Sequence, residues 1–273
     1  MTRFGFIGTG SMGSMLIKQF IGTGLVAPPD ITASSKTGIS ARALAERTGI
    51  TAVSANRTVA GNADVLVICV KPLEVRGVLK EIRSVLKPGT LLVSIAGCVS
   101  LEKLEDWAGN DVRCIRIIPS VTAEQNAGIS LVAWGNTIRP EDKTLVLGLL
   151  NGIGSAVETD ENNFDVFTDL TSCGPGLIAA MMQEFAGAGV RTGTIRPEFA
   201  EYLVRETMIG TARILAGGQM KFDDVVQRVA TKGGTTEEGV KILRARLPEV
   251  MDELIEATLV KRRQVTERVA GEE

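Results

Sequence analysis

The chain has 273 residues, of which 44% are hydrophobic, and a formal net charge of −2. This length and composition are sufficient for one large or two modest domains with apolar cores. The charge provides no overall basic field for nucleic acid or an anionic membrane, so we expect small-molecule partners, with no nucleic acid and no membrane.

A short apolar strand at residues 4–7 leads directly into Gly-Thr-Gly-Ser-Met-Gly at residues 8–13. This spacing is typical of a dinucleotide-binding turn: Gly8 permits the tight turn, Gly10 lets the backbone approach the pyrophosphate, and Gly13 lets the next helix pack on its strand. The exposed N–H groups at the helix start would bind the phosphates. Glycine is common here, at 30 of 273 residues, so a glycine-rich loop is the alternative. Helical spacing of apolar residues follows the glycines and favours the cofactor turn.

The segment after the second apolar stretch, residues 31–33, carries two hydroxyl groups and a cation in Ser34, Ser35 and Lys36, with Arg42 a little further on. NAD-preferring sites usually place Asp or Glu here to bind the ribose 2′-hydroxyl, whereas hydroxyls and a cation can hold a 2′-phosphate. The sequence therefore favours NADPH over NADH, with an ordinary polar loop as the alternative.

Strand-like and helix-like runs alternate as far as residue 160, which predicts a parallel sheet with helices on both faces. The remaining chain has helix-length periodic stretches and almost no strand signals. We therefore predict an α/β protein in which a Rossmann-like doubly wound sheet (residues 1–160) is followed by an all-helical domain (residues 161–273). In the second domain we expect a helix broken at Pro175. Further helices are expected over residues 197–216, 222–229, 236–246 and 248–268.

The four cysteines are scattered at positions 69, 98, 114 and 173. They lack the paired spacing of a zinc site and the density of a disulfide scaffold, so we expect reduced thiols, no metal site and a cytoplasmic location. The apolar runs are shorter than the roughly 18 residues of a membrane span. The start of the chain also lacks a signal-peptide pattern, so export is not expected.

The residue inventory restricts the chemistry, because the chain contains no histidine and no lysine lies between Asn151 and Val190. Histidine is the usual general acid or base near neutral pH. A nicotinamide enzyme without either group is suited to an electrophile that needs little help from an enzyme acid, such as a protonated imine. Positioning against the nicotinamide could then provide much of the catalysis.

A second notable segment, Lys-Gly-Gly-Thr-Thr at residues 232–236, lies in the helical domain. Thr235 with Glu238 fits a capping box, and the double glycine makes the turn. The same geometry exposes N–H groups and threonine hydroxyls that could hold a substrate carboxylate. Local spacing alone favours a cap without a ligand.

Together these motifs make the chain resemble the pyrroline-5-carboxylate reductases, over essentially its whole length. The resemblance rests on residues 8–13, 70–72, 94–97, 116–119, 172–175 and 232–236. It implies an NAD(P)H-dependent oxidoreductase acting on a C=N bond, which would convert 1-pyrroline-5-carboxylate to L-proline in proline biosynthesis. NADPH is the expected cofactor, with NADH as the alternative. The resemblance also implies a homodimer or larger homo-oligomer formed through the C-terminal helices, with the substrate site between subunits.

The resemblance assigns residues to both parts of the site. Expected cofactor-binding residues are Gly8, Thr9, Gly10, Ser11, Met12, Ser34, Ser35, Lys36, Asn56, Val70, Lys71, Pro72 and Ala96. Expected substrate-binding residues are Thr231, Lys232, Gly233, Gly234, Thr235 and Thr236. Thr236 matches a threonine near the ring nitrogen in the family, so it is the expected catalytic residue.

Three segments depart from the family pattern. Ser120-Val121-Thr122 replaces Asn-Thr-Pro, Cys173 replaces a serine, and Lys232 replaces a proline. These changes resemble the late-competence ComER-type branch. They motivate two alternatives, a nucleotide-binding regulatory protein on the reductase fold and a reductase for a different imine. An F420-dependent or hydroxy-acid oxidoreductase would share the first domain but not the helical-domain motifs.

Two of the residues that differ from the family pattern, Lys232 and Cys173, each have two possible interpretations. Lys232, with Arg228 nearby, would make the pocket more cationic and could pair with the substrate carboxylate, although charged side chains are more often solvated. Cys173 could be a redox-sensitive thiol, but we expect a small packing residue.

Overall fold

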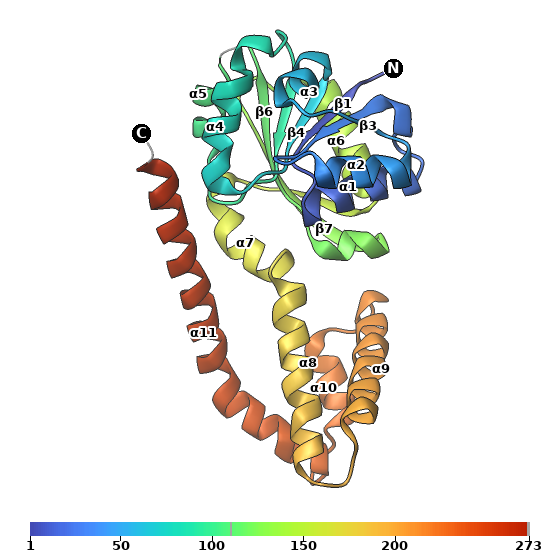
Figure 1. Ribbon diagram of the computed structural model, residues 1–273. Coiled ribbons are helices and arrows are strands. Elements are labelled where there is room, and N and C mark those ends of the chain that lie inside the picture. Colours follow the sequence, from blue (N-terminus) through green and yellow to red (C-terminus); the bar gives the residue numbers. More distant parts are fainter. Residues whose placement is uncertain (110, 272–273) are drawn as a thin grey trace. The chain divides into compact units, whose positions relative to one another are not determined.

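The computed structural model describes residues 1–109 and 111–271 and forms two compact units (Figure 1). Unit 1 comprises residues 1–173 together with 259–273, and unit 2 comprises residues 174–258. Across the described residues, none of the helices combines the length and apolar character that a membrane crossing requires.

The described residues of unit 1 form one sheet of eight strands, in the order β3-β2-β1-β4-β5-β6-β7-β8. The strands are β1 (Phe4–Ile7), β2 (Ile31–Ser34), β3 (Thr51–Ala52), β4 (Val65–Ile68), β5 (Leu91–Ser94), β6 (Arg113–Ile118), β7 (Gly128–Trp134) and β8 (Gly154–Glu158). Neighbouring strands are parallel, except that β7 runs antiparallel to β6. The first six strands have the order of a doubly wound dinucleotide-binding sheet, so the predicted Rossmann-like architecture is confirmed. The short strand β3 was not predicted.

Helices cover both faces of this sheet. They are α1 (Ser11–Gly22), α2 (Ile39–Thr48), α3 (Asn56–Asn62), α4 (Pro72–Ile82), α5 (Leu101–Ala108), α6 (Pro140–Asn151) and α7 (Phe164–Thr171), with short 3-10 turns η1 (Pro28–Asp30), η2 (Arg83–Val85), η3 (Val121–Gln125) and η4 (Glu161–Asn163). Alternate residues of β4 enter different cores: Val65 and Val67 pack beneath α1 and α6, whereas Leu66 and Ile68 pack beneath α3 and α4. Burial on both faces explains why β4 is apolar throughout.

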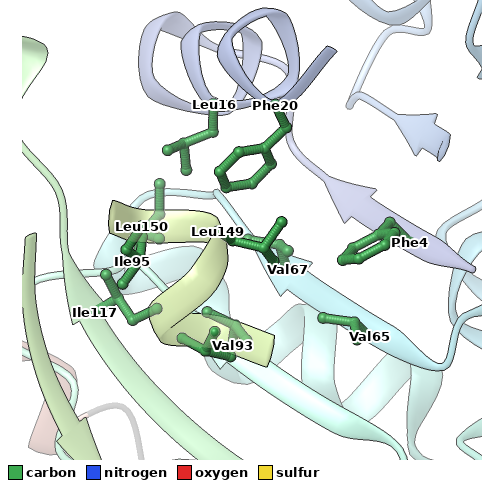
Figure 2. Close-up of a pocket in the computed structure, with 11 residues that line it drawn as sticks. Phe4, Leu16, Phe20, Val65, Val67, Val93, Ile95, Ile117, Leu149 and Leu150 are labelled. Atoms are coloured by element: carbon green, nitrogen blue, oxygen red, sulfur yellow. The ribbon is translucent and has the colours of Figure 1, made fainter. Parts of the chain in front are cut away.

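The core beneath α1 and α6 contains a cavity of about 30 Å³. Side chains from α1, the sheet and α6 point toward one another around it (Figure 2), and all of its lining residues are apolar. A space of this size and polarity is a packing gap that stays dry, because water would find no polar partner there. It is therefore no candidate for a substrate pocket.

The compact units differ from the predicted division at residue 160. Phe164, in α7, is 1% exposed and packs against Ile118 and Leu131 of the sheet. Val269, in the last turns of the C-terminal helix, is also buried and joins the core beneath α3 and α4. Both segments therefore belong to unit 1, because their apolar side chains are buried there.

Unit 2 consists of α8 (Gly174–Arg191), α9 (Pro197–Ala216), α10 (Phe222–Val229) and the larger part of α11 (Thr235–Ala270). The chain breaks between α7 and α8 just before Pro175, as predicted. The prediction of separate helices on either side of Pro248 is wrong, because α11 runs through this residue. An interior proline removes one N–H and disturbs one turn, but strong helical sequence on both sides can carry the helix past it.

The apolar side chains of unit 2 are largely unburied within one chain. Among its described residues, only Gly174, Ala186 and Ala200 are buried. Large exposed apolar residues occur on each of the four helices described in this unit, including Phe185, Phe199, Phe222 and Leu243. An apolar surface of this extent on one unit indicates an interaction face.

Candidate active site

The three glycines of the turn after β1 have different structural roles. Gly8 has φ +101°, and a Cβ on it would lie 2.7 Å from the carbonyl oxygen of Cys69. A Cβ on Gly13 would overlap the carbonyl oxygen of Gly8. A Cβ on Gly10 would meet no atom within 4 Å. Gly8 and Gly13 are thus needed by the turn itself, whereas Gly10 leaves open space in front of the α1 N-terminus, which has no side-chain cap. The turn therefore fits a pyrophosphate.

The carboxyl ends of four parallel strands place the other predicted cofactor segments at the same edge. The N–H of Gly8 donates to Ser34 O (2.9 Å), the N–H of Cys69 donates to Ile7 O (2.8 Å), and the N–H of Ile95 donates to Ile68 O (3.1 Å). The predicted cofactor segments therefore lie at the ends of adjacent strands of one sheet. They are residues 8–12, 34–36, 70–72 and 96. This edge is where dinucleotides bind in doubly wound folds.

Asn56 joins this set through its side chain. Its Oδ1 accepts a hydrogen bond from Ser34 Oγ (2.8 Å), and its Nδ2 donates to Glu81 Oε2 (2.8 Å). The hydroxyl of Ser34, which is wholly buried, is therefore engaged within the protein. Of residues 34–36, Ser35 and Lys36 remain as the groups that could face a 2′-phosphate. Lys36 is exposed, and the hydrogen bond that Ser35 Oγ accepts within the described part of the chain, from Ala41 N, is long (3.3 Å).

Glu74 is a residue of this edge that the sequence analysis missed. Its Oε1 lies 3.3 Å from Lys36 Nζ, and its Oε2 accepts the N–H of Lys71 (3.4 Å). One carboxylate thus links two predicted cofactor segments. The available signal was its position three residues after Lys71, the N-cap residue of α4, which is the capping-box position. Because Lys36 is highly exposed, this ion pair is weak, and Lys36 can re-pair with a phosphate.

Two segments that depart from the family pattern, residues 120–122 and 171–175, are joined by a hydrogen bond. Ser120 is buried, and its hydroxyl lies 3.0 Å from Thr122 Oγ1 and donates to Thr171 O (3.2 Å).

Burial, together with the charge of Asp169, raises the pKa of the Cys173 thiol. Cys173 therefore stays protonated and poorly nucleophilic at neutral pH, which agrees with a packing role rather than a redox role.

The predicted substrate loop lies in unit 2, where α11 begins at Thr235. Gly233 has φ +76° and the N–H of Gly234 donates to Thr231 O (2.9 Å), so the loop is a tight turn. The acid that caps it differs from the predicted one. Glu237 Oε2 accepts the N–H of Gly233 (2.7 Å), whereas Glu238 pairs with Lys241. Either acid can reach back along the first turn, and spacing alone does not choose between them.

The polar groups of this loop face solvent within the chain. Thr231, Lys232, Thr235 and Thr236 are all exposed. A carboxylate already rests against the turn in the form of Glu237, which shows that the Gly233 N–H is oriented to bind one. A substrate carboxylate at the same turn would therefore compete with Glu237, and a nearby cation would favour the substrate.

An open glycine turn on a doubly wound sheet, followed by a helical unit, is typical of nicotinamide-dinucleotide oxidoreductases. Residues 161–265 match the family model described as pyrroline-5-carboxylate reductase dimerisation, and residues 3–97 match the one described as NADP oxidoreductase, coenzyme F420-dependent. The chain belongs to the pyrroline-5-carboxylate reductase family.

Individual relatives cover nearly the whole chain. Pyrroline-5-carboxylate reductase 3 of Bacillus subtilis is 34% identical over 98% of this chain and 98% of that protein. ComE operon protein 4 of the same organism is 28% identical over 95% of this chain and 94% of that protein. The structure of a pyrroline-5-carboxylate reductase from Coxiella burnetii superimposes with a TM-score of 0.87 and 26% identity, covering 97% of this chain and 98% of that one. The resemblance found in the sequence is confirmed.

Proposed function

We propose that the protein reduces 1-pyrroline-5-carboxylate to L-proline with NADPH and serves proline biosynthesis in the cytoplasm. One observation carries the proposal: a chain that matches this family from end to end retains both an open glycine turn and a glycine-threonine loop that binds a carboxylate, its own Glu237. The first supports a dinucleotide and the second supports an anionic substrate.

The nucleotide domain would hold NADPH at the sheet edge. Gly8, Thr9, Gly10, Ser11 and Met12 would bind the pyrophosphate, and Ser35 and Lys36 would face the 2′-phosphate. The remaining contacts would come from Ser34, Asn56, Val70, Lys71, Pro72 and Ala96. No acid occupies residues 34–36, so nothing in that segment repels a 2′-phosphate, and we propose NADPH as the preferred cofactor with NADH as the weaker one. When bound, the reduced nicotinamide supplies the hydride.

The loop at residues 231–236 would hold the substrate. Its N–H groups and Lys232 would bind the carboxylate, and the hydroxyl of Thr236 would hydrogen-bond the ring nitrogen and orient the imine. The iminium carbon is already electrophilic, so an enzyme acid of the histidine type, which this sequence lacks, is not required. Bulk solvent, or a water molecule held by Thr236, would exchange the proton with the product nitrogen.

The active form would be a homodimer or larger homo-oligomer. The exposed apolar side chains of α8, α9 and α11 support this, because a second copy offers the same self-complementary surface. The match to a dimerisation model over residues 161–265 supports the same assignment. The substrate site would then be completed between subunits.

The test is NADPH oxidation at neutral pH with 1-pyrroline-5-carboxylate, with carboxylate-free 1-pyrroline and without substrate, each repeated with NADH. We expect rapid, carboxylate-dependent turnover that is faster with NADPH. In the Thr236→Ala variant, turnover should fall by about tenfold or more, while the NADPH dissociation constant stays unchanged. Tight NADPH binding without turnover on either imine would instead support a regulatory protein or a reductase for a different imine.

Lys232→Ala is expected to raise the Michaelis constant for 1-pyrroline-5-carboxylate by about three- to tenfold, because one exposed cation near the carboxylate is lost. The constant for 1-pyrroline and the turnover number should stay unchanged. Lys241→Ala is the matched control, since Lys241 is an exposed lysine in α11, the helix that follows the loop, and pairs with Glu238. Equal constants for Lys232→Ala and wild type would remove Lys232 from the site.

A further inference from the structure

Arg116, a buried arginine in β6, forms a salt bridge that has no role in the proposed function. Arg116 is 6% exposed, and its NH1 donates to Glu161 Oε1 at 2.6 Å. Its guanidinium carbon also lies 4.8 Å from the centre of the Phe164 ring. Glu161 lies 45 residues further along the chain, at the start of η4. The Glu161 side chain is 27% exposed, so the cost of desolvation falls mainly on Arg116. A buried guanidinium needs a reason, because removing it from water costs several kcal/mol.

Stability alone is a poor reason for this pair. Among the described residues, the buried Nε atom of Arg116 has no hydrogen-bond partner. Incompletely satisfied buried ion pairs often stabilise a protein no better than apolar residues of similar size. The pair must therefore be judged by what else it holds in place.

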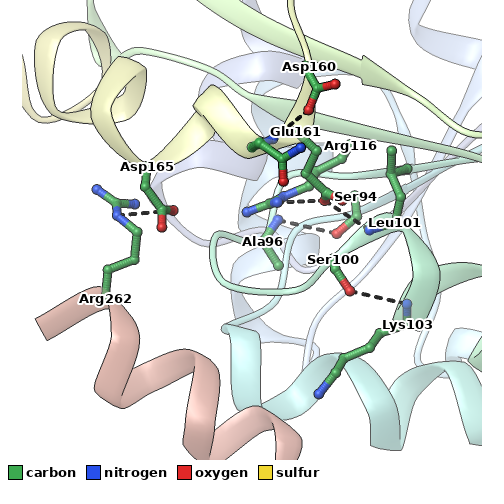
Figure 3. Close-up of polar contacts among 11 residues, drawn as sticks. Ser94, Ala96, Ser100, Leu101, Lys103, Arg116, Asp160, Glu161, Asp165 and Arg262 are labelled. Atoms are coloured by element: carbon green, nitrogen blue, oxygen red, sulfur yellow. Dashed lines mark hydrogen bonds and ion pairs between the residues drawn. The ribbon is translucent and has the colours of Figure 1, made fainter. Parts of the chain in front are cut away.

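Glu161 also holds the start of α5. The same Oε1 atom accepts the backbone N–H of Leu101 at 2.9 Å, across 60 residues of sequence (Figure 3). Arg116 itself stands opposite Ser94 in the parallel register of β5 and β6. Ser94 Oγ accepts the N–H of Ala96 at 3.3 Å. The segment of residues 95–100, between β5 and α5, is thus fixed at both of its ends.

This segment has a conformation that needs such support. Cys98 has φ +67°, which is uncommon for a residue other than glycine and costs of order 1–3 kcal/mol. Residues 95–100 leave the carboxyl end of β5, at the edge where the cofactor segments lie, and they include Ala96. A strained segment at this edge is fixed only if its surroundings impose its shape.

We propose that Arg116 and Glu161 are positioning residues that hold residues 95–100 in the shape required to receive the dinucleotide. This inference rests on the proposed function, since it assumes that NADPH binds at this edge. Arg116 fixes the Glu161 carboxylate, and Glu161 fixes the Leu101 N–H and hence the end of the segment. Neither residue touches the reacting atoms, so their effect is on cofactor binding.

The test replaces both charges together, in Arg116→Met/Glu161→Met, so that no unpaired ion is left buried. The NADPH dissociation constant, measured without substrate, should rise about tenfold or more because the segment is released. Hydrogen exchange of the Leu101 amide should accelerate by at least about tenfold. The melting temperature should fall by no more than in the control.

The control is Arg113→Met/Asp142→Met, in which Arg113 is the first residue of the same strand. Arg113 NH1 lies 3.0 Å from Asp142 Oδ2, both side chains are largely buried, and Asp142 Oδ2 also accepts the N–H of Arg139 at a helix start (3.0 Å). The two pairs therefore match in chemistry, but only the first reaches residues 95–100. The control should bind NADPH within about twofold of wild type.

A second variant covers the case in which the first double variant fails to fold. Leu101→Pro deletes the N–H that Glu161 accepts, at the first position of α5, where proline is tolerated. It also removes a leucine side chain that packs against two cores, so it is compared with Leu101→Ala, which loses that side chain and keeps the N–H. Leu101→Pro should weaken NADPH binding with the ion pair intact. Wild-type NADPH affinity in Leu101→Pro, or equal losses in the two double variants, would overturn the proposal. If wild-type protein bound no NADPH, the proposed function would fail, and the exchange rate of the Leu101 amide would still decide whether the pair holds this segment.

Discussion

Arg262→Met is expected to lower the free energy of unfolding by about 3–5 kcal/mol, because it leaves a buried carboxylate without this cation. The side chain of Asp169 is 0% exposed, and Arg262 NH2 donates to its Oδ1 at 2.6 Å. Arg262 also lies 3.5 Å from Asp165 (Figure 3), but Asp165 is half exposed and contributes little. The measurement is denaturant unfolding at one protein concentration, since an oligomer's stability depends on concentration.

Arg263→Met is the matched control for this prediction. Arg263 is the next residue of α11 and is exposed, so its replacement should change the free energy of unfolding by less than about 0.5 kcal/mol. The double variant Asp169→Leu/Arg262→Met removes both charges and should recover most of the lost stability. If Arg262→Met and Arg263→Met were equally stable, Arg262 would not anchor the end of α11 to α7.

Gly10→Ala and Gly13→Ala should separate cofactor binding from folding. Gly10 has φ −70° and open space around its Cα, so Gly10→Ala should fold with wild-type stability yet raise the NADPH dissociation constant by about tenfold or more, as its methyl group enters the pyrophosphate space. Gly13→Ala places a methyl group against the Gly8 carbonyl and should in addition lose about 1–3 kcal/mol of unfolding free energy.

Gly22→Ala provides the comparison for both variants. Gly22 is the last residue of α1 and a Cβ there would meet no atom within 4 Å, so neither stability nor NADPH affinity should fall. NADPH affinity is measured by titration without substrate, and stability by denaturant unfolding. An unchanged dissociation constant in Gly10→Ala would contradict the placement of the pyrophosphate at this turn.

The Rossmann-like fold of the first part of the chain was predictable because the residues that determine it are close together in sequence. Glycines at residues 8, 10 and 13 follow an apolar strand, and the continuous apolar residues of β4 show burial on both faces. The break before Pro175 was equally local. The prediction of a helix break at Pro248 was wrong. A proline shows that one N–H is missing, but it does not show whether the flanking turns are strong enough to continue the helix.

The polar contacts of the candidate site were not predictable in the same way. Glu237 and Glu238 are adjacent, and only the folded turn shows that Glu237 reaches Gly233. Glu74 links Lys36 to Lys71, which lie on segments that follow different strands. Side-chain direction and strand order select these partners, and neither is contained in local spacing.

The doubly wound sheet, the glycine turn, the helical second half and the family could all be predicted from the amino-acid sequence, since each depends on short-range pattern or on motifs. Which charges are buried and paired became clear from the folded chain alone. With 30 basic and 32 acidic residues, the chain offers many alternative pairs to Arg116–Glu161 and Asp169–Arg262, whose members lie 45 and 93 residues apart. Burial selects among them, because an ion removed from water persists only where the fold brings an opposite charge to it.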